Sequence, residues 1–297
     1  MPWPALPYAD WGDTCTTLHM WTQVIGKIRM AQSPHVNHWW HVALYVTSCG
    51  LTTSAIPNDG GTFTIDFDFH EHRLTIATSD GKHVDFALKP MTVTDFYERV
   101  LRCLRELGID VHIHTTPAEV ADPIPFEEDR LHQSYDAGAA RRFWEALVSS
   151  DRVLKEFRSR FIGKVSPVHF FWGGFDLAVS RFSGRRAPKH APIPGVSQAM
   201  IDEAYSHECS SVGWWPGGNG VDASYFAYTY PAPDGLPKAR VRPAEAAWSD
   251  AMGEFLLPYD AVRSAAHPER MLLDFCQSTY EAGANLAQWN RAELERS

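Results

Sequence analysis

The sequence predicts an α+β protein with an internally duplicated unit of helix, antiparallel strands and helix. The main observation is a repeat: segment 33–47 recurs as segment 166–180, with Ser-Pro, Trp, Leu and Val in the same places and no gap. Short segments of alternating polarity, separated by turns, lie between longer helical patterns. Strands do not alternate with helices in either half, so a doubly wound sheet or a barrel is disfavoured. We expect two apposed or fused antiparallel sheets with flanking helices.

The composition limits the class of protein. Hydrophobic residues make up 44% and charged residues 21% of the chain, as in a globular protein with a large core. The net charge of −9 argues against nucleic-acid binding, which needs a cationic surface. No apolar run is long enough to cross a membrane, and the N-terminus lacks a secretory signal pattern. Five cysteines without a CxxC pair are typical of reduced thiols, so we expect a cytoplasmic protein.

The first half, residues 1–117, begins with a Pro- and Trp-rich arm over residues 1–13 that we expect to dock on the body. Thr14 can cap a helix that extends to about Arg29. Its apolar residues recur every three or four positions and predict one buried stripe: Leu18, Trp21, Ile25 and Ile28. The remaining elements predicted for this half are strands over 33–47, 63–69, 72–77, 84–88 and 111–115, with a helix over 92–107.

Residues 118–137 are rich in Pro and acidic residues and predict a linker between the halves. The second half covers residues 138–297, and we expect both halves to form one compact unit. Its predicted helices and strands are a helix over 136–161, a strand over 168–182, a short helix over 197–205, strands over 224–230 and 255–257, and a helix over 268–289.

Several motifs that carry chemistry are absent. The chain has no phosphate-binding glycine loop, no GxSxG and no HExxH. His38 and His41 would face opposite sides of a regular strand, so they could share a metal ion only across a bulge. His112 and His114 share a face but have no acidic third ligand beside them. The sequence therefore predicts no metal site, and it indicates no particular cofactor.

The pair His207-Glu208 is the first candidate for proton transfer. It follows a predicted helix and precedes a Trp-rich strand, and a carboxylate near an imidazole can tune it for acid–base work near neutral pH. Adjacent residues of a strand point apart, however, so Glu208 could serve another partner and His207 could be structural. Cys209 follows directly, but no oxyanion-hole signature accompanies it, so a thiol nucleophile is disfavoured.

Asp176 is the second candidate, because it interrupts an apolar strand. A carboxylate in such a place needs a cation, and Lys27, Lys164 or Arg185 could supply it. The alternative is an acid whose pKa is raised by burial.

If the halves face each other, their leading segments would enclose a crevice. The eleven tryptophans fit an aromatic wall around such a cavity, or simply a large aromatic core. The residues that we expect to line the crevice and bind a ligand are His19, Trp21, Gln23, Lys27, His38, Trp39, His41, His169, Trp172, Arg181 and Tyr205.

Three hypotheses for function follow. The first is an enzyme acting on a small, partly aromatic or apolar molecule, with His207 as general acid or base assisted by Glu208 or Asp176. The second is a non-catalytic protein that binds a small ligand in the same crevice. The third is a structural protein whose tryptophans form an oligomer interface, so that a homo-oligomer is possible. In each case we expect neither a nucleic acid nor a membrane as partner.

Two blocks, Asn37-His38-Trp39-Trp40-His41 and Tyr205-Ser206-His207-Glu208, resemble those of a bacterial family of about 300 residues known only as a domain of unknown function. Segments 3–8, 18–23 and 175–185 extend the resemblance over nearly the whole chain. The resemblance implies a complete cytoplasmic unit and assigns no catalytic residue.

Overall fold

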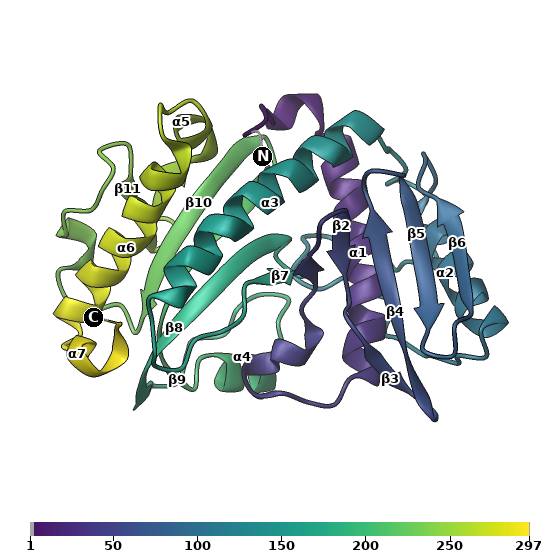
Figure 1. The fold of residues 1–297 in the computed structure, drawn as a ribbon, viewed down its shortest axis with the longest axis horizontal. Coiled ribbons are helices and arrows are strands. Elements are labelled where there is room, and N and C mark those ends of the chain that lie inside the picture. The colour runs from purple at the N-terminus through teal and green to yellow at the C-terminus, as the bar shows by residue number, and fades with distance from the viewer. Residues whose placement is uncertain (1–2, 297) are drawn as a thin grey trace.

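Helix α1 (Gly12–Gln32) lies between two antiparallel sheets and contacts elements of both (Figure 1). The computed structural model describes residues 3–296. Leu18, Trp21 and Ile25 are fully inaccessible to solvent, and α1 buries polar residues as well. A helix buried on nearly every side is part of the core. The two six-stranded sheets and their flanking helices confirm the predicted α+β class.

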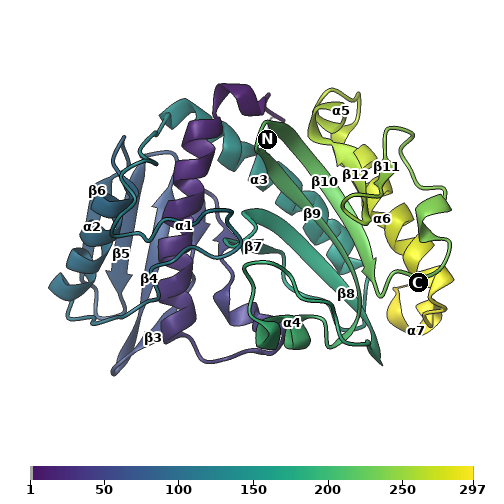
Figure 2. The ribbon, with the colours of Figure 1, turned by 180° about the vertical axis from the view of Figure 1, so that it is seen from behind.

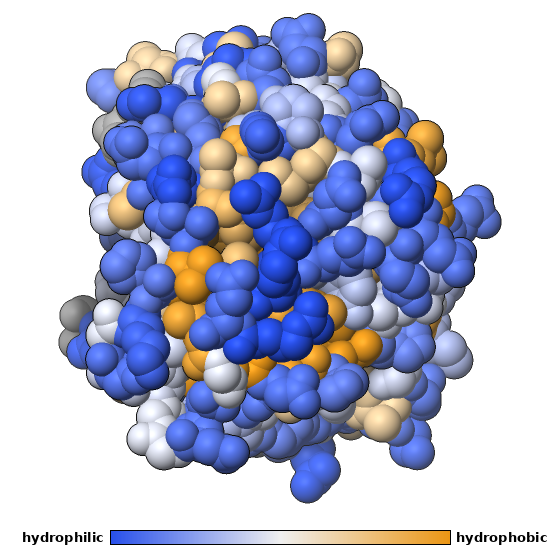
Figure 3. Space-filling view, turned by 90° about the vertical axis from the view of Figure 1, so that its right-hand side faces the viewer, coloured by the Kyte–Doolittle hydropathy of each residue, from blue (hydrophilic) through white to orange (hydrophobic). Residues whose placement is uncertain are grey.

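The first sheet has the order β1-β2-β4-β5-β6, with β3 also paired to β4. Along β4, Phe63, Ile65 and Phe67 are buried, and the residues between them are partly exposed. Helix α2 (Val93–Glu106), capped by the Thr92 hydroxyl, packs against α1. On the side of the molecule where the first sheet and α2 lie, the surface is mostly hydrophilic with small apolar patches (Figure 3). The strands are β1 Tyr45–Val46, β2 Gly50–Thr52, β3 Ile56–Asn58, β4 Gly61–Asp68, β5 Arg73–Thr78 and β6 His83–Ala87.

The second sheet has the order β11-β12-β10-β9-β8-β7. Helices α3 (Ala137–Ser159) and α6 (Pro268–Leu286) cover one of its faces (Figure 1). That face carries the buried side chains of Trp214 and Tyr225, and the Tyr225 hydroxyl lies 2.8 Å from the Ser150 hydroxyl of α3. The strands are β7 His169–Phe171, β8 Asp176–Arg186, β9 His207–Gly218, β10 Val221–Tyr230, β11 Ala247–Ser249 and β12 Glu254–Pro258.

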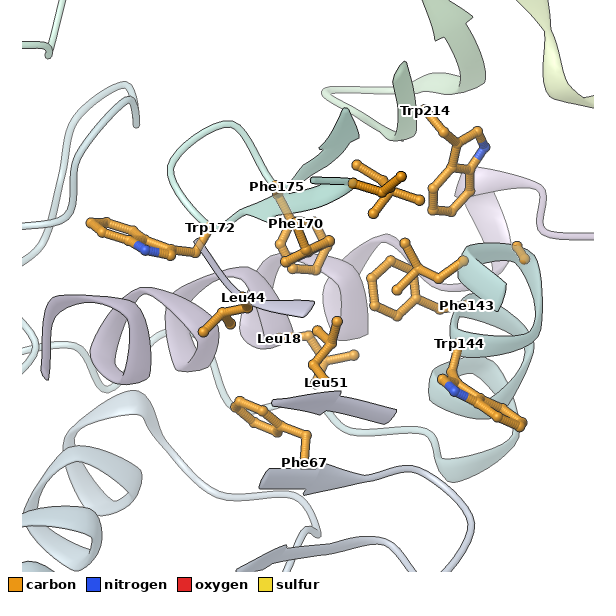
Figure 4. Packing of buried hydrophobic residues seen from close by; sticks show 14 of the residues in the cluster. Leu18, Leu44, Leu51, Phe67, Phe143, Trp144, Phe170, Trp172, Phe175 and Trp214 are labelled. Carbon is orange, nitrogen blue, oxygen red and sulfur yellow. The ribbon is translucent and has the colours of Figure 1, made fainter. Parts of the chain in front are cut away.

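The two sheets meet at the repeated segments. Leu44 and Phe170 form an isolated antiparallel bridge between them. The side chains of both residues belong to one hydrophobic core that continues through Leu18, Phe143 and Phe175 (Figure 4). The indole N–H of Trp172 donates to the backbone oxygen of Val42 at 2.8 Å, so the space between these segments is filled.

Three predicted strands are corrected. Segment 33–47 is mainly a short 3-10 helix, η2 (Asn37–Val42), because His38 and Trp39 have left-handed backbones with φ of 59° and 60°. Segment 168–182 is two strands, β7 and β8, because the chain turns at residues 172–175. Segment 111–115 is irregular; Val111 packs into the core although the segment joins no strand.

The N-terminal arm docks as predicted over residues 3–13. Leu6 and Trp11 are buried, and the Tyr8 amide donates to Asp222 at 2.7 Å. Met1 and Pro2 lie outside the described residues. Within residues 3–296, no helix has the length and apolar character that a membrane span requires. The remaining elements are η1 Tyr8–Asp10, α4 Gln198–Ala204, η3 Leu236–Lys238, α5 Tyr259–Arg263 and α7 Arg291–Leu294.

Candidate functional site

The second sheet has a face that its two long helices leave open. From behind, β8, β9 and β10 lie in front of α3 and α6, with α4 at one end (Figure 2). A solvated antiparallel face is normally polar, as on β4 with its Thr64, Asp66 and Asp68. The open face of the second sheet instead carries large rings and acids, so it is a candidate binding surface. Its half-buried residues include Phe171, Asp176, Trp215, Phe226, Tyr228, Glu254 and Leu256.

Two carboxyl groups border the turn between β7 and β8. A β-carbon placed on Gly174 would lie 2.8 Å from Asp176 Oδ1 and 3.7 Å from Glu119 Oε2. A β-carbon on Gly173 would collide with the Glu119 carboxylate. The two carboxylates thus occupy the space beside the two glycines that side chains would otherwise fill. Asp176 and Glu119, distant in sequence, share one small region.

Asp176 carries no compensating cation. Among residues 3–296, no Lys, Arg or His nitrogen lies within 4.0 Å of its carboxylate. Burial, and then the negative charges of Glu119 and Glu254, raise the pKa of Asp176 to about 8. Burial also raises the pKa of Glu119, although its side chain keeps contact with solvent, and raises that of Glu254 to about 7. Of the two hypotheses for Asp176, the structure thus favours an acid with a raised pKa over a buried ion pair.

Helix α1 positions both carboxyl-bearing segments. His19 Nε2 donates to the backbone oxygen of Gly173 at 2.8 Å, and its ring stacks on Phe175 at 4.9 Å. The Gln23 side chain donates to the Ala118 carbonyl at 2.7 Å and accepts from the Ala118 amide at 2.8 Å. Burial lowers the pKa of His19 to about 4, so the ring is neutral near pH 7. Both residues, predicted as ligand-binding, hold backbone segments instead.

Two tyrosines lie on the same side of the sheet. The hydroxyl of Tyr205, which follows α4, is 3.3 Å from the hydroxyl of Tyr228. Burial raises the pKa of Tyr205 to about 12, and the charges of Asp176 and Glu119 contribute to the rise. Tyr205 therefore stays protonated and can donate a hydrogen bond near the acids.

His207 and Asp176 are not brought together. Asp176 begins β8, whereas His207 pairs in register with Arg186 at the other end of that strand, roughly 30 Å away along it. Glu208 accepts hydrogen bonds from Ser183 at 2.9 Å and from Arg185 at 2.9 Å, so it does not assist His207. The predicted catalytic group is thus divided between two places.

The other residues predicted to bind a ligand have mostly structural contacts. Trp21 stacks on Phe96 in the core. Arg181 is buried between Phe157 and Tyr280 on the helix-covered face. The remaining contacts are Lys27 over the Trp172 ring, Trp172 against Gly26, His41 near Trp39 and His35, His38 beside His207, and a fully buried His169 near Trp40 and Tyr45.

The residues that the sequence did not reveal are Glu119, Glu254, Trp215, Phe226 and Tyr228. The strand residues had a usable signal, since large rings alternate with buried side chains in β10. Glu119 had none, because it lies in an irregular loop and has φ of 58°.

Two further observations bear on ligands. Across the described part of the chain, no three His, Cys, Asp or Glu side chains are grouped so that they could hold a metal ion. A depression of about 560 Å³ lies between the N-terminal arm and the start of α6. It is open to solvent and borders none of the predicted site residues; its lining includes Trp3, Glu156, His267, Glu269, Arg270 and Leu273.

Comparison with known proteins identifies the family. A model described as a family of unknown function, DUF5996, matches residues 3–296. No curated protein matches the chain, and no solved structure does. The match extends from the N-terminal arm to the end of α7, and therefore includes both sheets and the open face. The chain belongs to the DUF5996 family.

Proposed function

We propose that this protein is an enzyme that performs general acid–base chemistry on a small molecule bound to the open face of the second sheet. One observation carries the proposal: the half-buried Asp176 carboxyl has no cationic partner and lies across a two-glycine turn from the Glu119 carboxyl. Perturbed carboxyl pairs of this kind occur at sites of proton transfer.

The two carboxyl groups have different surroundings, and this gives them different roles. Glu119 keeps contact with solvent and is the group that ionises more readily. Its negative charge then favours the protonated form of Asp176, whose pKa of about 8 keeps it an acid at neutral pH. Asp176 would donate a proton to the ligand, and Glu119 would accept one.

The surroundings also restrict the ligand. The half-buried rings of Trp215, Phe226 and Tyr228 can stack against a planar or apolar surface. The nearby carboxyl groups repel anions. We infer a neutral or cationic small molecule as substrate. This proposal replaces the pair His207 and Glu208 by Asp176 and Glu119, while it keeps the cytoplasmic location, the aromatic binding site and the origin of the halves by duplication.

A non-catalytic binding protein is the second candidate. It is favoured by the number of rings on the open face, since a binding site needs stacking surfaces and no proton donor. A homo-oligomer in which this face is covered by a second copy is the remaining possibility from the sequence, and it predicts a higher mass in solution.

The experiment uses the full chain and a mixture of metabolites sorted by charge. Mass spectrometry identifies compounds that the protein consumes and, after rapid filtration, compounds that it only retains. An enzyme consumes a neutral or cationic compound, and Asp176→Asn abolishes the consumption. The control is Asp110→Asn, which changes an exposed acid outside the site. Consumption that survives Asp176→Asn, or consumption of anions alone, contradicts the proposal; retention without consumption supports the binding protein.

A further inference from the structure

A second cluster of ionisable residues lies at the other end of β8. The Lys164 ammonium donates to His38 Nε2 at 2.7 Å. His38 Nδ1 lies 3.1 Å from the backbone oxygen of Ala204, so Nδ1 carries the proton and Nε2 has the free electron pair. The His207 ring lies 5.9 Å from the His38 ring, and His207 pairs in register with Arg186. Two imidazoles and an ammonium thus lie close together, and burial, then the positive charges of Lys164 and Arg186, lower the pKa of His207.

These groups have no anionic partner in the chain. Within residues 3–296, neither Lys164, Arg186 nor His207 has a carboxylate oxygen within 4.0 Å. The two nearby acids are engaged elsewhere: Glu208 binds Arg185 at 2.7 Å and Glu203 binds His35 at 2.9 Å. In a chain of net charge −9, an uncompensated group of basic side chains is unexpected. Positively charged hydrogen-bond donors without a carboxylate partner can form charge-assisted hydrogen bonds with an oxyanion.

Aromatic rings border the same donors. The Lys164 nitrogen lies 5.3 Å from the Trp40 ring centre and 5.4 Å from the Phe182 ring centre. The His38 ring lies 4.7 Å from Phe182 and 5.3 Å from Trp40. A ligand that reaches the donors therefore also meets two large rings.

The backbone beside the cluster is strained. His38 and Trp39 both have left-handed backbones, which are costly for residues other than glycine. Helix α4 packs against η2, and the His38–Ala204 hydrogen bond ties the two together. Strained residues of this kind persist where surrounding structure holds them, and they concentrate at ligand sites.

We propose that Lys164, His207 and Arg186 form a binding site for an oxyanion, a carboxylate or phosphoryl group, carried on a planar or apolar body that packs against Trp40 and Phe182, while His38 holds the Lys164 ammonium in place through its Nε2. The site is independent of the Asp176 site: it takes the opposite charge and lies at the opposite end of β8. It also differs from the catalytic role predicted for His207, which here binds a ligand and need not transfer a proton.

Calorimetric titration of the full chain tests the proposal with benzoate, phenyl phosphate, inorganic phosphate and benzylamine. We expect both aromatic oxyanions to bind, inorganic phosphate to bind more weakly, and benzylamine, whose charge suits the Asp176 site, to leave the NMR signals of His38 and His207 unchanged. The ratio of the affinities for benzoate and phenyl phosphate distinguishes a carboxylate from a phosphoryl group as the preferred oxyanion. Histidine NMR signals report the location, and those of His38 and His207 should shift.

Variants complete the test. Lys164→Met should weaken oxyanion binding by about tenfold or more, because it removes a charge-assisted hydrogen bond. Lys164→Arg keeps the charge and should retain most of the affinity. The matched control Lys155→Met removes an exposed lysine of α3 and should change nothing. The proposal is wrong if no oxyanion binds at millimolar concentration, if benzylamine shifts the His38 and His207 signals as the oxyanions do, or if the Lys164→Met and Lys155→Met variants bind oxyanions alike.

Discussion

Leu44 and Phe170 exchange two backbone hydrogen bonds, of 2.9 and 2.8 Å, and this pair is the point at which the two sheets join. The two residues lie in segments 33–47 and 166–180, whose sequences resemble each other. A single bridge therefore links the two sheets through segments with related sequences. The helices and the core are arranged around this junction, so changes here should affect both halves together.

Phe170→Ala should destabilise the whole fold. The Phe170 ring is fully buried and packs against Phe143 and Phe175. Removal of such a ring from a core costs about 3–5 kcal/mol, which urea denaturation can measure. Phe171→Ala is the control, since this neighbour is half-buried and should cost clearly less. Equal losses would show that the junction is not a core position.

Asp176→Asn should stabilise the protein at alkaline pH. The folded-state pKa of about 8 exceeds the ordinary value of about 3.9, so the folded state binds more protons than the unfolded state between these values. Stability from this group is therefore full at low pH and is lost as pH rises toward 8. The variant should flatten that decline, which for one proton amounts to about 1.4 kcal/mol for each pH unit between the two pKa values. Chemical denaturation over pH 5–9 checks this, and an unchanged slope would argue against the raised pKa.

Glu119→Gln should lower the pKa of Asp176. The change removes the nearest negative charge and keeps the shape of the side chain. Carbon NMR of labelled aspartate can follow the titration. Glu128→Gln, which changes an exposed acid elsewhere in the same loop, should leave the titration as it is. If the two variants titrate alike, the carboxyl groups are not coupled.

Gly26→Ala should destabilise the fold, although alanine is about 1 kcal/mol more favourable than glycine in a helix interior. A β-carbon at Gly26 would collide with Cδ1 and Nε1 of the Trp172 ring. Overpacking of this kind costs about 1–3 kcal/mol, and the indole would also lose its hydrogen bond to Val42. Thermal unfolding measures the balance. A raised melting temperature would mean that the ring moves away freely and that the glycine is not needed for packing.

Much of the fold could be predicted because its signals are local. The stripe of α1 and the alternation of β4 depend on neighbours in sequence, and the structure confirms both elements. The predicted cap Thr14 was wrong, because α1 already begins at Gly12 and Thr14 lies inside the helix. The predicted strands over 33–47 and 168–182 were wrong. Left-handed residues interrupt the first segment, and a turn interrupts the second. Those backbone angles are set by tertiary contacts, such as the one between His38 and Ala204.

The candidate site was predictable only in part. Asp176 could be found because an acid within an apolar strand is conspicuous, and Tyr205 lay in a block with a family resemblance. Glu119 could not, because only the folded chain brings its loop to the two-glycine turn. The predicted link from His207 to Asp176 failed for a geometric reason: ten positions along β8 separate Asp176 from Arg186, the residue that pairs with His207.

The two bonds that Gln23 makes with Ala118 have a consequence for how the halves divide their work. Helix α1 comes from the first half, yet the proposed acid, Asp176, comes from the second, and Glu119 lies in the connection between them. Neither half expressed by itself would assemble the acid pair. If one gene segment was once copied, the copies have since specialised. One supplies helix α1, which holds the backbone around the acids, and the other supplies Asp176 and the open face.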